Sequence, residues 1–363
     1  MRQKILTLMR AALGTEITPE EAAAISAEDL RQIAVISRAQ SVMSIVSDGY
    51  DILCDRGLIK AKDMPNDLLN TWLKGTRETE MRYERLLGHM ADTAALLESH
   101  GLRTYQLKGA VFAECYPVPQ HRRSLDADCF VMSPSGQPGA WEKANTIMES
   151  VPGCKVERGY YKHSSFKFSK LKIENHQFLT PFRGNSTLIE MERLLQGLLR
   201  NDDGSERIPG TAICKPPVMV SALFLIEHAY SHFLSEGLKI QQIMDWVLFL
   251  RKHRGQIDMQ KFEGYLDKFA LRAFYESFSN VGNYLAGHLD EEGKSLSHKD
   301  LLMLEDMWKG PEGSDGFGIK GKLELARNIA RSHWKYREFS NISMPRALFI
   351  KVRGYLFQPH PKI

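Results

Sequence analysis

The chain has 363 residues, of which 43% are hydrophobic and 25% are charged. This length exceeds what one small core supports and predicts two or three structural units that share an interface. The formal net charge of +4 is small for the length, so composition alone does not indicate a nucleic-acid-binding protein, and any basic function must be local.

The cysteines and the apolar stretches bear on the compartment. The five cysteines are widely spaced and form no Cys-x-x-Cys pair, which gives no zinc signature and favours a reducing compartment. Arg10 interrupts the apolar start of the chain, and the most apolar later stretch, residues 218–234, carries Glu227 and two histidines. We therefore expect a cytoplasmic protein with no integral membrane segment.

Residues 1–100 are predicted to be helical throughout. Thr18 and Pro19, followed by two acids, have the pattern of a helix N-terminus, and Ser26 begins another helix in the same way. Between about 77 and 100, apolar residues recur at steps of three and four until Gly101, which predicts a helix with one buried face. Residues 1–76 are assigned to an N-terminal helical region.

The pattern then changes to that of strands. The predicted strand segments are LRTYQL (102–107), DADCFVM (126–132), KVERGYYK (155–162) and SFKFSKLKIENHQFL (165–179). The last two are expected to form an antiparallel pair, and helices are expected between the first two strands and over about 138–150. This order predicts an α+β fold, in which residues 77–186 form a small mixed sheet with helices on it.

From residue 187 to 363 the chain is predicted to form a C-terminal helical region. Residues 201–217 are expected to be a loop, and the glycine-rich segment 309–322 is the best linker candidate. That segment contains GFGIKGK, which matches a phosphate-binding loop only in its glycines and lysine; no apolar strand precedes it, so a flexible loop is the favoured interpretation. The basic tail, 331–353, has interleaved aromatics that would suit single-stranded RNA or a membrane surface, although a solvated helix face is commoner.

Asp126 and Asp128 form the first candidate site. Alternate residues of a strand point to the same face, where two carboxylates repel each other unless a cation lies between them. Surface strand ends often show this pattern, but here Lys108 and Gly109 end the preceding strand before a short helix, and so offer an ammonium and backbone N–H groups to a phosphate. Carboxylates that hold divalent cations opposite a phosphate-binding turn are what the transfer of a nucleotidyl group needs.

These residues resemble the signature of the uncharacterised nucleotidyltransferases in the DNA polymerase β-like superfamily. Its pattern runs from Leu-Lys-Gly through a helix and Tyr-Pro to Arg-x-x-x-Asp-x-Asp, then to Glu-x-His, a His pair and a later Asp. The matching residues are Lys108, Gly109, Tyr116, Pro117, Arg122, Asp126, Asp128, Glu174, His176, His228, His232 and Asp245. The resemblance covers about 75–250. The chain departs from the family at Leu125, often a glycine, and at Asn175, often apolar.

The resemblance implies a polymerase β-like nucleotidyltransferase core between helical flanks. Such an enzyme moves a nucleoside monophosphate from a nucleoside triphosphate such as ATP to an acceptor hydroxyl and releases pyrophosphate. Asp126, Asp128 and Glu174 would be catalytic and hold Mg²⁺ or Mn²⁺. Nucleotide-binding roles fall to Lys108, Gly109, Arg122, His176, His228 and His232. The acceptor, whether a protein, an RNA, a sugar or a small molecule, and the oligomeric state are left open, and the alternative is a catalytically inactive relative that binds a nucleotide or RNA.

Two assignments stay open at this level. Glu190 rivals Glu174 as the third carboxylate, although an acid at the start of a helix favourably meets the helix dipole without any catalytic role. His228 and His232 lie one turn apart on an apolar helix, where hydrogen-bonded core histidines are commoner than phosphate contacts, and zinc is least favoured because no third ligand lies close in the sequence.

Overall fold

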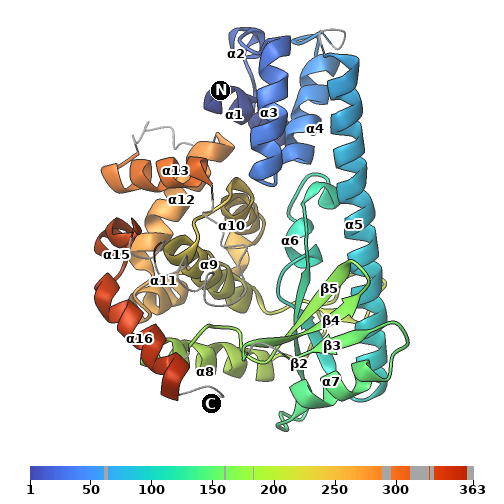
Figure 1. Ribbon diagram of the computed structural model, residues 1–363, viewed down its shortest axis with the longest axis vertical. Coiled ribbons are helices and arrows are strands. Elements are labelled where there is room, and N and C mark those ends of the chain that lie inside the picture. The colour runs from blue at the N-terminus through green and yellow to red at the C-terminus, as the bar shows by residue number, and fades with distance from the viewer. Residues whose placement is uncertain are drawn as a thin grey trace.

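The structure is a computed structural model that describes residues 1–60, 64–158, 161–182, 184–287, 296–310, 327 and 331–357. A six-stranded mixed sheet is combined with many helices. Figure 1 shows the sheet beside the long helix α5 (Asn66–Ser99), with helices of the N-terminal region above it and helices of the C-terminal region on its other side. The predicted α+β class is confirmed.

The sheet places the candidate residues on adjacent strands. The strands are β1 (Arg103–Gln106), β2 (Ala127–Met132), β3 (Lys155–Glu157), β4 (His163–Phe168), β5 (Leu171–His176) and β6 (Ile213–Cys214), in the order β3-β4-β5-β2-β1-β6. β2 is fully buried and pairs antiparallel to β1 and parallel to β5, with Asp128 directly opposite Glu174. The strand of Glu174 therefore lies directly beside the strand of Asp126 and Asp128.

Two details of the predicted strands are wrong. The segment 165–179 is not one strand, because Ser169 takes a left-handed backbone with φ of 56° and turns the chain back, so that β4 and β5 form a hairpin and β3 pairs with β4. The predicted loop at 201–217 contains β6, which extends the sheet beside β1. A two-residue edge strand leaves too short a pattern for alternation to reveal.

The N-terminal helices are α1 (Arg2–Ala12), α2 (Pro19–Ala23), α3 (Ala27–Ala39) and α4 (Met43–Asp55). Both predicted N-termini are confirmed, since Thr18 and Ser26 each close a capping box over α2 and α3. α5 begins at Asn66, earlier than expected, and so runs across the boundary proposed between residues 76 and 77. It ties the N-terminal helices to the sheet, against which it packs.

The remaining helices are α6 (Ala110–Ala113), α7 (Ala140–Glu149), α8 (Ser186–Arg200), α9 (Val218–Ser235), α10 (Ile240–His253), α11 (Met259–Lys268), α12 (Arg272–Ala286), α13 (His298–Lys309), α15 (His333–Phe339) and α16 (Met344–Phe357). By length and hydropathy α9 could cross a membrane, contrary to the expectation from its sequence, but most of it is buried inside the fold, as a core helix would be. Described side chains from all three predicted regions form one contiguous core.

The basic tail is partly buried and partly exposed. Tyr336 and Phe339 are buried, and the Lys335 ammonium is buried and lies 2.7 Å from Asp306 Oδ2. These side chains are part of the packing against α9 and α13, so they offer no stacking surface for RNA. Other basic residues of the tail are exposed, as a solvated helix face would be: Arg337, Arg346, Lys351 and Arg353. The GFGIKGK segment lies outside the described residues.

The loop before β2 is held by a buried ion pair. The Arg122 guanidinium donates to both carboxylate oxygens of Asp245 on α10, at 2.8 and 2.7 Å, and Tyr116 donates to the same carboxylate at 2.6 Å. Both charged side chains are 6% exposed. Two parallel hydrogen bonds fix orientation as well as distance, so this pair sets the approach of the chain to Asp126.

Asp245→Asn should destabilise the fold strongly. The substitution keeps the shape of the side chain but leaves the buried Arg122 charge uncompensated, which costs about 3–5 kcal/mol of the free energy of unfolding. Asp267→Asn is the matched control, because Asp267 pairs with Arg272 while 61% exposed; we expect less than about 1 kcal/mol there. Urea unfolding of both variants measures the difference, and equal losses would contradict the structural role.

The contacts of His121, the residue before Arg122, predict a pH-dependent contribution to the stability of the fold. Its ring nitrogens lie 2.8 Å from Asp48 Oδ2 and 3.1 Å from Glu80 Oε1, so both nitrogens donate and the imidazole is charged. Burial opposes this, but the two carboxylates raise the pKa of His121 above its usual 6.5. Because the folded-state pKa is raised, the stabilisation is complete below the ordinary value and is lost as pH rises through the raised one. His121→Gln should therefore cost about 1.5–3 kcal/mol near pH 6 and clearly less near pH 9; a pH-independent loss in parallel denaturation curves would contradict this.

Candidate active site

Asp128 is the centre of the candidate site. Its carboxylate is buried on β2, accepts a hydrogen bond from His176 Nε2 at 2.9 Å and lies 3.0 Å from Lys108 Nζ. His176 Nδ1 also donates, at 3.2 Å, to the Phe178 carbonyl, so both ring nitrogens act as donors and the imidazole is charged. Burial alone would raise the pKa of Asp128, but Lys108 and then His176 hold it well below its ordinary value.

Glu174 lies beside Asp128 on β5. Its Oε2 is 3.4 Å from His163 Nε2 and 3.6 Å from His176 Nε2, and Lys172 donates to Oε1. Burial again opposes ionisation, but the imidazole of His176 and the other cationic neighbours lower the pKa of Glu174 to about 2. Both acids are therefore ionised at neutral pH.

Asp126 is at the solvent side of the cluster. Its side chain is 32% exposed, and its Oδ2 lies 3.6 Å from the Lys172 ammonium, which also binds Glu174. Burial and then the charge of Asp128 raise the pKa of Asp126. The repulsion expected between two carboxylates on one strand face is thus present.

Lys108 and Gly109 lie where the sequence places them, between β1 and α6. Gly109 has φ of 78°, and an added Cβ would approach Gln106 Nε2 to 2.5 Å, so a larger residue would be strained here. Lys108 Nζ lies 3.3 Å from His228 Nε2, on a ring stacked against Phe224. Burial and the Lys108 charge lower the pKa of His228 well below its ordinary value, so the ring is neutral and accepts from Lys108.

Three predicted or rival residues lie apart from the acids. Arg122 is engaged by Asp245, so the structure gives it a partner other than a phosphate. His232 contacts the His228 ring but is 34% exposed and faces Glu236 at 3.6 Å. Glu190 is exposed and faces Lys268 at 3.4 Å, whereas Glu174 adjoins Asp128, so the geometry favours Glu174 as the third carboxylate.

Sequence reasoning missed Lys162, His163 and Lys172, all on or beside the β4–β5 hairpin. Lys162 is 8% exposed, and within the described residues its ammonium has no hydrogen bond or ion pair. Burial lowers the pKa of Lys162, and the negative charge of Glu227 opposes this effect. The positive charge of Lys108 lowers the pKa of Lys162 further, so the two ammonium groups repel each other. No local signal distinguishes this lysine from the others in the hairpin; only its position opposite the acids does.

The donor set fits a divalent cation. Asp128, Glu174 and His176 offer ligand atoms that all lie within 4.8 Å of one another, with Asp126 next to them on the same strand face. Ionised carboxylates suit Mg²⁺ and Mn²⁺, and an imidazole ligand is better tolerated by Mn²⁺. His176, which was predicted to bind the nucleotide, lies beside these acids, and its Nε2 would bind a cation only after losing the proton that it donates to Asp128.

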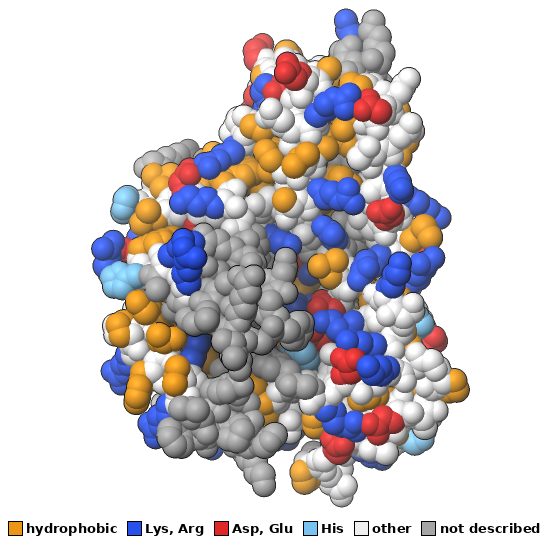
Figure 2. All heavy atoms as spheres, in the orientation of Figure 1, with side chains coloured by type: hydrophobic (Ala, Val, Ile, Leu, Met, Phe, Trp, Pro, Cys, Tyr) orange, Lys and Arg blue, Asp and Glu red, His pale blue; other side chains and the backbone are white. Residues whose placement is uncertain are grey.

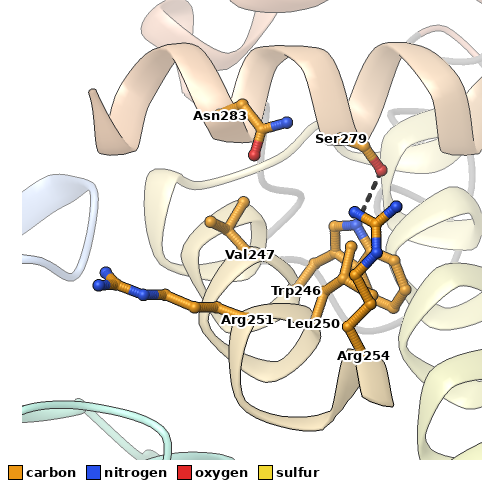
Figure 3. Close-up of a pocket in the computed structure, with 7 residues that line it drawn as sticks. All are labelled: Trp246, Val247, Leu250, Arg251, Arg254, Ser279 and Asn283. Carbon is orange, nitrogen blue, oxygen red and sulfur yellow. Dashed lines mark hydrogen bonds between the residues drawn. The ribbon is translucent and has the colours of Figure 1, made fainter. Parts of the chain in front are cut away.

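A separate cavity of about 440 Å³ lies between α10 and α12. Figure 3 shows its walls, in which the Trp246 indole donates to Ser279 Oγ at 2.9 Å. Val247 and Leu250 make it largely apolar, and none of the predicted site residues lines it. The acidic cluster, which lies elsewhere, is therefore the candidate site.

Comparison with known proteins bears on the same residues. Neither the curated proteins nor the solved structures contain a significant match to the chain. One family model does match, over residues 31–281, and its description is "uncharacterised nucleotidyltransferase". The match spans more than half of the chain and includes every candidate site residue, so the chain belongs to this family of uncharacterised nucleotidyltransferases.

Proposed function

We propose that the protein is a divalent-cation-dependent nucleotidyltransferase that moves a nucleoside monophosphate from a nucleoside triphosphate to an acceptor hydroxyl. The observation that carries the proposal is the buried group of Asp128, Glu174 and His176, in a chain of this family. In the reaction, the acceptor oxygen bonds to the α-phosphorus, the bond to the pyrophosphate oxygen breaks, and the acceptor proton leaves to water.

Asp128 and Glu174, with Asp126 and His176 beside them, would hold the metal. A bound cation would supply charge neutralisation for the phosphates and lower the pKa of the acceptor hydroxyl. The protein's own contribution is positional, because strand pairing fixes the acids before any ligand arrives. Groups fixed in this way lose no reorganisation energy during the reaction.

Lys108 and Lys162 are the side chains best suited to bind the leaving pyrophosphate. Lys108 is oriented by Asp128 and by the neutral His228. Lys162 is buried with an ammonium that no described residue pairs, and an unpaired buried charge is costly unless a ligand compensates it. A triphosphate oxygen is the compensation that the proposed reaction provides.

Turnover should depend on Glu174 and not on Glu190. Even outer partners of a metal ligand are worth about 10- to 100-fold, so Glu174→Gln should reduce transfer by at least about 100-fold. Glu190→Gln is the matched control and should stay near wild type, because Glu190 is exposed and its ion pair is with Lys268 and not with the candidate site. The assay incubates purified protein with α-labelled nucleoside triphosphates, Mg²⁺ or Mn²⁺ and cell extract as the acceptor source. Metal-dependent nucleotide binding without labelled product in the wild type would instead indicate the inactive binding module.

Lys108→Met and Lys162→Met should both weaken triphosphate binding but change stability in opposite directions. A lost charge-assisted hydrogen bond of about 1.5–3 kcal/mol corresponds to roughly 10- to 150-fold in affinity. Lys108→Met strips a partner from buried Asp128 and should destabilise the protein. Lys162→Met removes a buried ammonium that no described side chain pairs and that the fields of Glu227 and other acids only partly offset, so it should stabilise the protein by about 0.5–2 kcal/mol.

Calorimetric titration with a non-hydrolysable triphosphate and thermal unfolding measure the two effects. Lys261→Met, at an exposed position of α11, is the control and should change neither. Unchanged triphosphate affinity in Lys162→Met would remove Lys162 from the site, and a loss of stability there would show that its burial is structural.

A further inference from the structure

A cleft of about 680 Å³ opens beside the candidate active site. Its walls are the α3–α4 junction, one side of α5 and the turn between β4 and β5. Leu125 and Leu171 also line it, and these are the chain neighbours of Asp126 and Lys172. The cleft therefore comes within one residue, along the chain, of Asp126 and Lys172, although neither of these lines it, and it extends along α5.

The cleft is strongly basic. Its basic residues are Arg38, Arg82, Arg85, Arg123 and Lys170, against the single acid Glu78. Within the part of the chain that the structure describes, none of the five forms an ion pair with an acid. Figure 2 shows Lys and Arg side chains gathered over α5 and the adjoining helices. A concave surface of one charge sign concentrates ligands of the opposite sign.

Three of the arginines, Arg38, Arg82 and Arg123, lie close enough for their charges to repel one another. Arg82 donates to the carbonyls of Ser124 and Leu125, and Arg123 donates to the carbonyl of Arg38 at 3.2 Å, so their charges are held in place without being neutralised. Burial, and then the charges of Arg38 and Arg82, lower the pKa of Arg123. Assembling like charges in this way costs stability, and an anionic ligand would repay it.

The length and the surface of the cleft narrow the class of ligand. The α5 residues that line it run from Gly75 to His89, which is about 21 Å of helix and longer than one nucleotide. Apolar and aromatic surface alternates with the arginines: the Phe168 ring stacks on His89 with centroids 4.7 Å apart, and Leu125 is 49% exposed. Phosphate-binding cations interleaved with flat apolar surface are the features that bind unpaired bases and their backbone.

We propose that this cleft binds a single-stranded nucleic acid, and that a terminal hydroxyl of the strand is the acceptor in the transfer reaction. The second half of this statement rests on the proposed function, and the first half does not. Leu125 would contact the last base, and the hydroxyl beyond it would reach Asp126.

The test compares two charge-removing double variants. Arg38→Gln/Arg85→Gln removes two cleft guanidinium groups that make no side-chain hydrogen bond within the described residues, so the fold should be kept. Arg193→Gln/Arg346→Gln removes the same charge from exposed positions on α8 and α16, outside the cleft. Fluorescent RNA and DNA oligonucleotides of one sequence are titrated at several salt concentrations. A non-hydrolysable triphosphate and poly-glutamate are titrated alongside.

We expect the cleft variant to lose at least about 10-fold in oligonucleotide affinity. Its salt slope should fall by about 1.4, or about 0.7 for each lost phosphate contact, while the control variant matches wild type. Triphosphate affinity should be equal in all three proteins, and α-labelled nucleotide should label the strand that binds more tightly. The comparison of RNA with DNA decides which sugar the cleft accepts.

Three results would overturn the inference. Equal oligonucleotide affinity in the cleft variant and wild type would remove the arginines from the strand path. Poly-glutamate binding as tight as that of the oligonucleotide would indicate an acidic protein instead. Loss of triphosphate affinity in the cleft variant would assign the arginines to the nucleotide. Failure of the proposed function is distinguishable, because wild type would then bind oligonucleotide without metal-dependent triphosphate binding.

Discussion

The buried carboxylate of Asp128 is the constraint on which the rest of the site depends. A charge this far from water is tolerated only when paired, and here Lys108 and His176 contact its two oxygens from different elements. These contacts fix the end of β1, the end of β5 and the start of β2 relative to one another. Glu174 then lies opposite Asp128 because parallel strands in register bring equivalent positions together.

The sequence predicts those parts of the site whose geometry is local. Strand alternation is enough to put Asp126 and Asp128 on one face, and the change from strand to glycine predicts the turn after Lys108. In the structure the Glu174 strand pairs with β2 and so adds the third acid to this face. The division of the chain at residues 77 and 187 stays a prediction, and α5 is continuous across the first of these points.

What the sequence could not supply depends on contacts between distant segments. Arg122 has the pattern of a phosphate ligand, yet a carboxylate on α10, more than a hundred residues later, accepts two of its hydrogen bonds. Lys162 is an ordinary lysine in a lysine-rich hairpin until the turn at Ser169 and the pairing of β4 with β5 place it beside the acids. The basic tail shows the opposite error, because Tyr336 and Phe339 were considered for binding and are core residues.

The loop before β2 joins the two charged surfaces of the molecule. Arg82 binds the carbonyls of Ser124 and Leu125, while Arg122 anchors the same loop to α10, so its backbone is held from both sides. Along the chain, only Ser124 and Leu125 separate basic Arg123 from acidic Asp126. A basic and an acidic surface so close together would act differently on the phosphates and on the hydroxyl end of an anionic acceptor. If the acceptor is the strand proposed above, the basic cleft would attract its phosphates, and the acids would repel them unless a cation is bound. Binding of the nucleotide with its metal would therefore remove this repulsion and let the acceptor hydroxyl approach the acids. This favours an order in which the nucleotide binds before the acceptor.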